Sequence, residues 1–301
     1  MRRRRAASAS MPNAAALARG AARERILLFG LSLPALVLVT VTMIIPVGWL
    51  FWLSALDDRG HLSFVNYARL IDQPSYARIL LATLEISLLT TIISAVLGYL
   101  LAYLLCELPR RLAALLMIGV LAPLWTSILV RTYAWLVLLQ RDGVINHWGL
   151  RLGIWKTPLH LVYNMDGTVI GLVHIMLPFL ILPLYGAMRA IDRDLLRAAA
   201  NLGAGPLAVF WRVFFPLSLP GLFAGSVIVF VLSLGSYVTP AVLGGGRVIM
   251  VANQVANDIN TFFNWGAASA FGVMLLVLTL AVLFVASRAF RIERLVGGHG
   301  A

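Results

Sequence analysis

The 301-residue chain has little cysteine, little lysine and little charge of either sign. Cys106 is its one cysteine, which excludes an internal disulfide and a metal site built from several cysteines. We interpret it as a small apolar residue near a helix end. Lys156, the one lysine, stands outside any Gly-x-x-x-x-Gly-Lys-Ser/Thr pattern, so the sequence has no phosphate-binding loop for ATP. Metalloprotease and nucleophile-elbow motifs are missing too, which leaves an intramembrane enzyme poorly supported.

The composition defines a membrane protein. Only 12% of the residues are charged, 61% are hydrophobic and the mean hydropathy is +0.91, whereas a soluble domain carries about 25% charged residues. Each long apolar run can cross about 30 Å of hydrocarbon as a helix. We therefore predict an all-α integral membrane protein with six spans, at residues 26–53, 79–105, 112–139, 169–188, 217–238 and 268–290.

The arginines set the predicted orientation. With the N-terminus inside, the inner segments hold sixteen of the 24 basic residues and five acids, which gives the inner side a net charge of +11. The outer side and the spans together carry only +1. Positive residues favour the cytoplasmic side of a bacterial inner membrane, so both termini are predicted to be cytoplasmic.

These assignments divide the chain into three parts. Residues 1–25 are predicted to form a basic, disordered cytoplasmic tail, residues 26–294 the six-span domain, and residues 295–301 a short cytoplasmic tail. On the outer side, the segment after Gly244 is predicted to be a partly helical re-entrant piece. Gly221 and Gly225 make a GxxxG pattern in the fifth span, which favours close helix packing.

A polar insert separates the fourth and fifth spans. Its first helix is predicted to begin at an N-cap, Asp192 or Asp194, and to stop at Gly203, a residue suited to a left-handed backbone. Pro206 suits the first turn of a second helix, predicted to end before Pro216. A simple connection needs no capped helices, so this cytoplasmic insert is predicted to be a surface that another protein binds.

The insert resembles the EAA loop of ABC-importer permeases, whose pattern is Glu-Ala-Ala, three residues, Gly, nine residues and Ile-x-Leu-Pro. Ala198 and Ala199 precede Gly203 by the family's spacing, and Pro216 closes the pattern. Arg197 occupies the glutamate position with the opposite charge, which puts the partner's usual ion pair there in doubt. The resemblance implies that residues 192–216 dock into an ATPase and couple transport to its closure.

Three further segments resemble the spermidine/putrescine permeases of ABC importers. They are PLWTSILVRTYAW at 123–135, RDGVIN at 141–146 and GSYVTPAVLGG at 235–245. The resemblance covers most of the chain after the tail and implies the type I (MetI-like) importer fold. It also implies a second, homologous permease, two ATPase subunits that bind ATP and Mg, and a periplasmic solute-binding protein. No cofactor is implied in this chain. Relatives that carry opines or amino-acid-like solutes have similar motifs.

Ionisable and aromatic residues in the outer half mark a candidate substrate pathway. An intramembrane carboxylate is costly, so Glu85 either contacts a cationic solute or pairs with Arg78, Arg131 or a hydroxyl of a neighbouring span. Arg131 would repel a cation and is expected to pair with an acid or a carbonyl. Tyr133 and Trp135 either contact a cation or form an interfacial belt. The candidates are Glu85, Trp125, Arg131, Tyr133, Trp135, Tyr237, Asn253 and Asp258.

Two alternatives stay open for the remaining polar positions. Tyr237, Asn253 and Asp258 either form an outer gate or cap loops and turns. His174 in the fourth span either bonds to a neighbouring helix or relays protons. An ion-coupled secondary transporter is the competing class, and it requires more deep ionisable residues or two repeated halves, which the sequence lacks.

Overall fold

The computed structural model describes residue 27, residues 30–57 and residues 59–297, with side chains to Arg288. The predicted tail 1–25 lies outside these residues. Within them the chain is helical and forms no strand, only an isolated bridge between Leu56 and Leu62. The chain separates into two compact units, Met1–Trp52 and Leu53–Ala301, which are described one at a time.

The described part of the first unit is a single apolar helix. The span Gly30–Ser54 contains a π-helical turn, η1 (Thr40–Ile44), followed directly by α2 (Ile45–Ser54). Pro46 is the second residue of α2 and has no N–H to donate. The wider turn before it lets the helix continue without a break.

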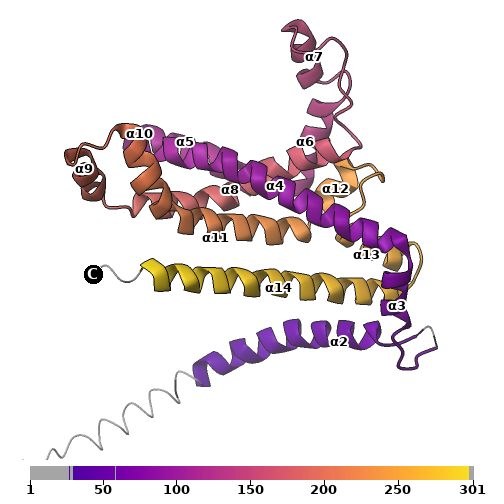
Figure 1. Cartoon of the computed structure of the whole chain (residues 1–301). Helices are drawn as coiled ribbons and strands as arrows, with labels where there is room; N and C mark the ends of the chain where they lie inside the picture. Colours follow the sequence, from indigo (N-terminus) through magenta and orange to yellow (C-terminus); the bar gives the residue numbers. More distant parts are fainter. Residues whose placement is uncertain (1–26, 28–29, 58, 298–301) are drawn as a thin grey trace, which may run out of the picture. The chain divides into compact units, whose positions relative to one another are not determined.

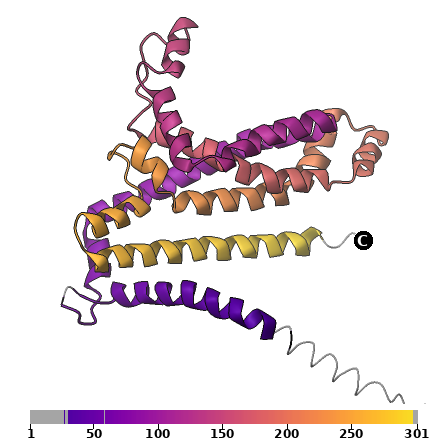
Figure 2. The same cartoon turned by 180° about the vertical axis from the view of Figure 1, so that it is seen from behind.

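The second unit is a bundle of long helices. α4 (Pro74–Glu107), α8 (Met165–Arg189), α11 (Phe215–Leu234) and α14 (Trp265–Gly297) run alongside one another in both views (Figures 1 and 2). α8 is the central helix, because 67% of its most apolar window is buried against 28–33% in the other three. It begins at Asn164, whose side chain accepts from the Gly167 N–H at 2.9 Å.

The GxxxG pattern lets α11 approach α8 closely. A Cβ atom at Gly221 would lie 3.1 Å from the Pro183 carbonyl oxygen, and one at Gly225 would lie 2.9 Å from the Leu180 carbonyl oxygen. Helices in a membrane gain nothing from hiding apolar surface from lipid, so they associate through close packing at small residues. The prediction that these glycines support helix packing agrees with this geometry.

The predicted third span 112–139 is not one straight helix. α5 (Arg110–Leu121) passes through a 3₁₀ turn, η2 (Ala122–Trp125), and α6 (Ile128–Leu139) then leaves at an angle, so that the two halves are bent by 104°. Pro123 removes a backbone donor, and Thr126 and Ser127 have extended ψ angles of 151° and 139°. The sequence prediction missed this break because the apolar run continues through it.

Two other boundaries of the spans differ from the prediction. The fifth span runs from Pro206 to Leu234 rather than from 217 to 238. It stops at Gly235, after which the short helix α12 (Val238–Leu243) starts anew. The helix of the last span continues into the predicted tail at 295–301 as far as Gly297. The segment after Gly244 contains one helix, α13 (Val251–Asn260), as expected for a partly helical piece.

The two ends of the bundle carry different elements. α9 (Arg193–Asn201) and α10 (Pro206–Val209) lie at the same end as the C-terminal end of α14 (Figure 1). α3 (Val65–Asp72) and α13 lie at the opposite end. This grouping agrees with the sequence assignment, which places residues 192–216 and the end of the last span on one side of the membrane.

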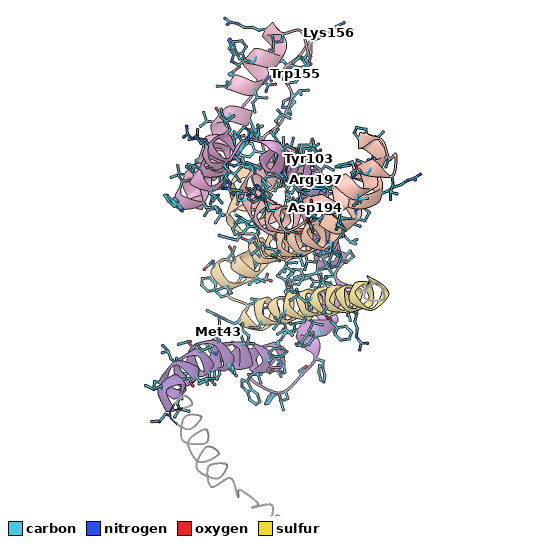
Figure 3. All side chains as sticks on the ribbon, turned by 90° about the vertical axis from the view of Figure 1, so that its left-hand side faces the viewer. Met43, Tyr103, Trp155, Lys156, Asp194 and Arg197 are labelled. Atoms are coloured by element: carbon cyan, nitrogen blue, oxygen red, sulfur yellow. The ribbon has the colours of Figure 1, made fainter. Side chains whose placement is uncertain are left out.

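A projecting arm follows the bend. α6 leads away from the bundle to α7 (Val144–Arg151), and Trp155 and Lys156 lie at its tip (Figures 1 and 3). Asn146 holds the arm together, because its Nδ2 donates to the Leu159 carbonyl at 2.9 Å and its Oδ1 accepts from the Leu159 N–H at 2.8 Å. The arm is therefore an ordered element rather than a loose connection.

The close α8–α11 contact yields a test. Gly225→Ala should lower the free energy of unfolding by about 1–3 kcal/mol, because the new methyl group meets the Leu180 backbone, which cannot rotate away. Gly186→Ala is the control within α8, since a Cβ there has no neighbour within 4 Å. Thermal unfolding followed by circular dichroism measures both. Equal melting temperatures for the two variants would contradict the packing argument.

Candidate functional site

The insert between α8 and α11 begins with a capped helix. Asp192 precedes α9, and its carboxylate accepts from the Asp194 N–H at 2.9 Å, which selects Asp192 from the two predicted caps. Gly203 follows the helix with φ +86°, a backbone that L-residues with side chains rarely adopt. A Cβ at Gly203 would meet nothing within 4 Å, so the left-handed backbone alone requires glycine there.

The second half of the insert corrects the sequence prediction. Pro206 does start α10, but the helix does not end before Pro216. It passes through a π-helical turn, η3 (Phe210–Phe214), in which the Phe215 N–H bonds back to the Phe210 carbonyl, and it continues as α11. Pro216 stands in the first turn of α11. A wider turn ahead of a proline accommodates the missing donor, as it does before Pro46.

The insert presents apolar and small side chains to its surroundings. Leu202 is 89% exposed and Leu207 is 72% exposed. Ala198 is exposed and Ala199 is partly exposed. Exposed apolar groups on a polar segment are typical of a surface that another protein covers.

The charged side of α9 is neutralised locally. Arg197 Nη1 lies 2.9 Å from Asp194 Oδ1, and both side chains are 76% exposed (Figure 3). The ion pair therefore stays within one helix and adds little stability, because water screens it. The guanidinium that replaces the family's glutamate thus has a carboxylate of its own chain beside it.

Aromatic side chains fasten the insert to α4. Phe210 meets Tyr103 edge-on with ring centroids 5.4 Å apart, and Phe214 meets the same ring at 5.4 Å. The Tyr99 hydroxyl lies 2.9 Å from Ser218 Oγ. A displacement of the insert must therefore move α4 and α11 with it. Sequence reasoning missed these residues, although Phe210 and Phe214 stand four apart and hence on one helix face.

Two of the outer-half candidates point away from the core of their own chain. Glu85 is exposed on α4, whereas the adjacent Ile86 is fully buried. Neither Arg78 nor Arg131 forms an ion pair with it among the described residues. Trp125, at the break before α6, is 93% exposed. A carboxylate at membrane depth must face protein or water rather than lipid.

Arg131 and His174 come together beside Trp135. The Trp135 and His174 rings meet edge-on at 5.5 Å, and Arg131 is near enough to His174 for an electrostatic interaction. Among the described residues, Arg131 Nε and Nη1 and His174 Nδ1 are buried without hydrogen-bond partners. The acid or carbonyl expected for Arg131 and the helix bond expected for His174 are therefore not found there. Tyr133 is 55% exposed on the same helix.

Tyr237 and Asn253 are joined through the backbone. Asn253 Nδ2 donates to the Tyr237 carbonyl at 3.0 Å, and Asn253 Oδ1 accepts from the Met250 N–H at 3.3 Å. Asn253 is 7% exposed, while the Tyr237 side chain is 48% exposed. The amide thus ties α13 to the start of α12, and the Tyr237 ring is the exposed group of the two.

Asp258 lies at the end of the unit that carries α3 and α13, and it is 2% exposed. Its Oδ1 accepts from Gln254 Nε2 at 2.7 Å. Burial raises the pKa of the carboxyl, and the hydrogen bond from Gln254 opposes that rise. Glu85, Asp258 and Arg131 thus occupy separate surroundings. No group of three His, Cys, Asp or Glu side chains in the described ranges gathers to hold a metal ion.

The fold and the insert define a multi-pass membrane permease that works in a transport system. Residues 94–291 match the family described as binding-protein-dependent transport system inner membrane component. The chain belongs to this family. The match includes the entire insert, α4 from Ser94 onward and α14 up to Arg291.

Individual relatives agree with the family. The spermidine/putrescine transport system permease protein PotB of Escherichia coli K12 is 34% identical over 240 residues, covering 78% of this chain and 87% of that protein. PotB of Haemophilus influenzae is 33% identical over 263 residues, covering 87% and 90%. These relatives confirm the resemblance read from the sequence.

Solved structures confirm the fold. A bacterial alginate ABC transporter in complex with an alginate-bound periplasmic protein includes a chain that superposes with a TM-score of 0.73 at 16% identity, covering 91% of this chain and 96% of that one. The predicted all-α, type I importer architecture is therefore correct, with five straight spans and one bent pair in the described residues.

The aromatic anchor gives a local test. Phe210→Ala should loosen the insert and speed tryptic cleavage at Arg193 and Arg197 by about five- to hundredfold, because each of the two lost contacts with α4 is worth about 0.5–1.5 kcal/mol and 1.4 kcal/mol is a factor of ten. Leu207→Ala is the control, since that side chain is 72% exposed. Unchanged cleavage in the Phe210 variant would show that the rings do not hold the insert.

Proposed function

We propose that this chain is a transmembrane permease subunit of an ABC importer that carries a small cationic solute, a polyamine such as spermidine or putrescine, into the cytoplasm. The observation that carries the proposal is the 34% identity to a spermidine/putrescine permease over 78% of the chain. Both termini are cytoplasmic in this proposal, and the insert faces the cytoplasm.

The partners follow from what the chain lacks. It carries no phosphate-binding loop of its own, so two ATPase subunits bind ATP and Mg and supply the energy. A second, homologous permease completes the pathway, and a periplasmic solute-binding protein delivers the solute. This chain itself needs no cofactor.

The mechanism is alternating access without covalent chemistry. Closure of the ATPase pair draws the docked inserts together, and the left-handed turn at Gly203 sets the angle between α9 and α10. The contacts of Phe210 and Phe214 with Tyr103 pass the movement to α4, and the unbroken helix passes it to α11. The spans then open to the outside, accept solute and reset after hydrolysis.

The outer half offers a cation two kinds of contact. Glu85 is exposed on α4, where a carboxylate offsets part of the hydration that an ammonium group loses. The Tyr237, Tyr133 and Trp125 rings are also exposed, and ring faces attract cations. Arg131 repels a cation, so the solute passes on the side of Glu85.

Uptake into proteoliposomes tests the assignment. Spermidine should enter when ATP is supplied and the membrane potential is collapsed, and Glu85→Gln should lower that uptake several-fold because the amide cannot neutralise an ammonium group. Loss of uptake on collapse of the potential would favour an ion-coupled secondary transporter. Uptake of an opine or an amino acid in place of spermidine would support the ABC mechanism and show that the solute is not a polyamine.

The turn between α9 and α10 tests the coupling role. Gly203→Val should abolish uptake and stimulation of the ATPase while the protein still inserts, because a β-branched residue at φ +86° forces the turn to change. Gly205→Val is the matched control, since Gly205 has φ −66° and free space around its Cβ position. Normal uptake and normal ATPase stimulation in the Gly203 variant would show that the insert does not couple the ATPase to transport.

A further inference from the structure

A cavity of about 320 Å³ lies where several spans end, beside the insert. Glu107 is the last residue of α4, Arg110 is the first of α5, Arg189 is the last of α8 and Arg193 is the first of α9. The cavity therefore sits at the level where the spans leave the membrane. In the orientation proposed above, that level is the cytoplasmic headgroup region.

The cavity has a charged rim and an apolar floor. Three arginines and one glutamate line the rim, and all four side chains are exposed. Met188 and Phe214 are buried beneath them. A phosphodiester headgroup with acyl chains attached has this same division, a charged end followed by an apolar one.

The arginines are free to take an external anion. In the described part of the chain, neither Glu107 nor any other carboxylate forms an ion pair with Arg110, Arg189 or Arg193. Arg193 Nη2 donates to the Cys106 carbonyl at 3.3 Å, which fixes that guanidinium over the end of α4. Arg189 lies over the Tyr185 ring at 5.9 Å. Within the described residues, both guanidinium groups keep N–H donors that have no acceptor.

We propose that this cavity binds the phosphate of an anionic phospholipid from the cytoplasmic leaflet. Guanidinium groups bind phosphate through paired, charge-assisted hydrogen bonds, and basic pockets between spans on this side of a membrane suit such headgroups. A polyamine is repelled by the same rim. The proposal rests on the cytoplasmic orientation of the proposed function, but it holds for any transported solute.

A bound phosphate would join elements that must move together. Arg110, Arg189 and Arg193 belong to α5, α8 and α9, so one anion contacts the ends of two spans and the start of the docking helix. The lipid thereby becomes part of the hinge of the insert, and the composition of the leaflet affects how firmly α9 is held.

Retention of lipid by the intact assembly tests the proposal. The full-length chain, purified with the subunits that accompany it, is placed in nanodiscs of mixed phosphatidylglycerol and phosphatidylcholine, and native mass spectrometry counts the lipids it keeps. We expect Arg110→Gln with Arg189→Gln to weaken retention of phosphatidylglycerol about tenfold, because each replaced guanidinium loses charged hydrogen bonds. These two side chains make no hydrogen bond in the described structure, so the fold should survive.

A neighbouring arginine and the lone cysteine supply the controls. Arg111→Gln removes the same charge from α5 at an exposed position outside the cavity, and it should retain lipid like the original chain. Cys106 lines the cavity, so bound phosphatidylglycerol should slow its alkylation by N-ethylmaleimide several-fold. Equal retention by the double variant and the original chain would overturn the proposal.

A second arm identifies the source of the phosphate. In nanodiscs of phosphatidylcholine alone, added inorganic phosphate should leave the alkylation of Cys106 unchanged. Protection by inorganic phosphate equal to that by phosphatidylglycerol would overturn the assignment to lipid. These measurements need neither solute nor ATP, so they fail or succeed independently of the transport experiment.

Discussion

The close contact of α8 with α11 is the constraint on which the second unit depends. Lipid offers no hydrophobic drive for one apolar helix to join another, so the helices are held by backbone approach at Gly221 and Gly225. α8 could not be central otherwise, because a methyl group at either glycine would meet its backbone. α4 packs on the same two helices, and its buried face is rich in hydroxyls such as Ser87, Thr90 and Ser94. Small residues thus hold the helices of this membrane bundle together, a role that large apolar residues have in the core of a soluble protein.

A second constraint explains the irregular places. At membrane depth every backbone N–H and C=O needs a partner within the protein or in a water-filled space. Prolines break this rule locally, and three of them are accommodated in one of two ways, while other prolines lie inside α8 and α11 without interrupting the helix. Before Pro46 and Pro216 the helix widens by a π-helical turn and continues, whereas after Pro123 it breaks and turns by 104°. Only the break after Pro123 starts a new helix, α6. The first N–H groups of α6, from Ile128 onward, face the surroundings of the break.

The sequence therefore predicted composition-driven features well and local geometry less well. The apolar spans and the family were readable because hydropathy and motif spacing are properties of the chain itself. The cap at Asp192 and the left-handed Gly203 were readable for the same reason. The bend after Pro123 and the helix through Pro216 were missed, because an uninterrupted apolar run looks identical whether a proline breaks it or a wider turn absorbs it. Contacts across helices, such as Tyr103 with Phe210, depend on packing that no single segment encodes.

The reversed charge at Arg197 can now be weighed against the rest of the insert. Its guanidinium is paired with Asp194 one turn earlier, at a site open to water, where such a pair contributes little. Leu202 and Leu207 are 89% and 72% exposed and carry no charge to mismatch. In the proposed docking on an ATPase, the contact of the apolar side chains supplies most of the binding free energy. The charges at the rim of that contact determine which ATPase binds and how fast the two proteins associate. The departure at Arg197 then changes which ATPase fits, while the lever formed by α10, η3 and α11 stays the same.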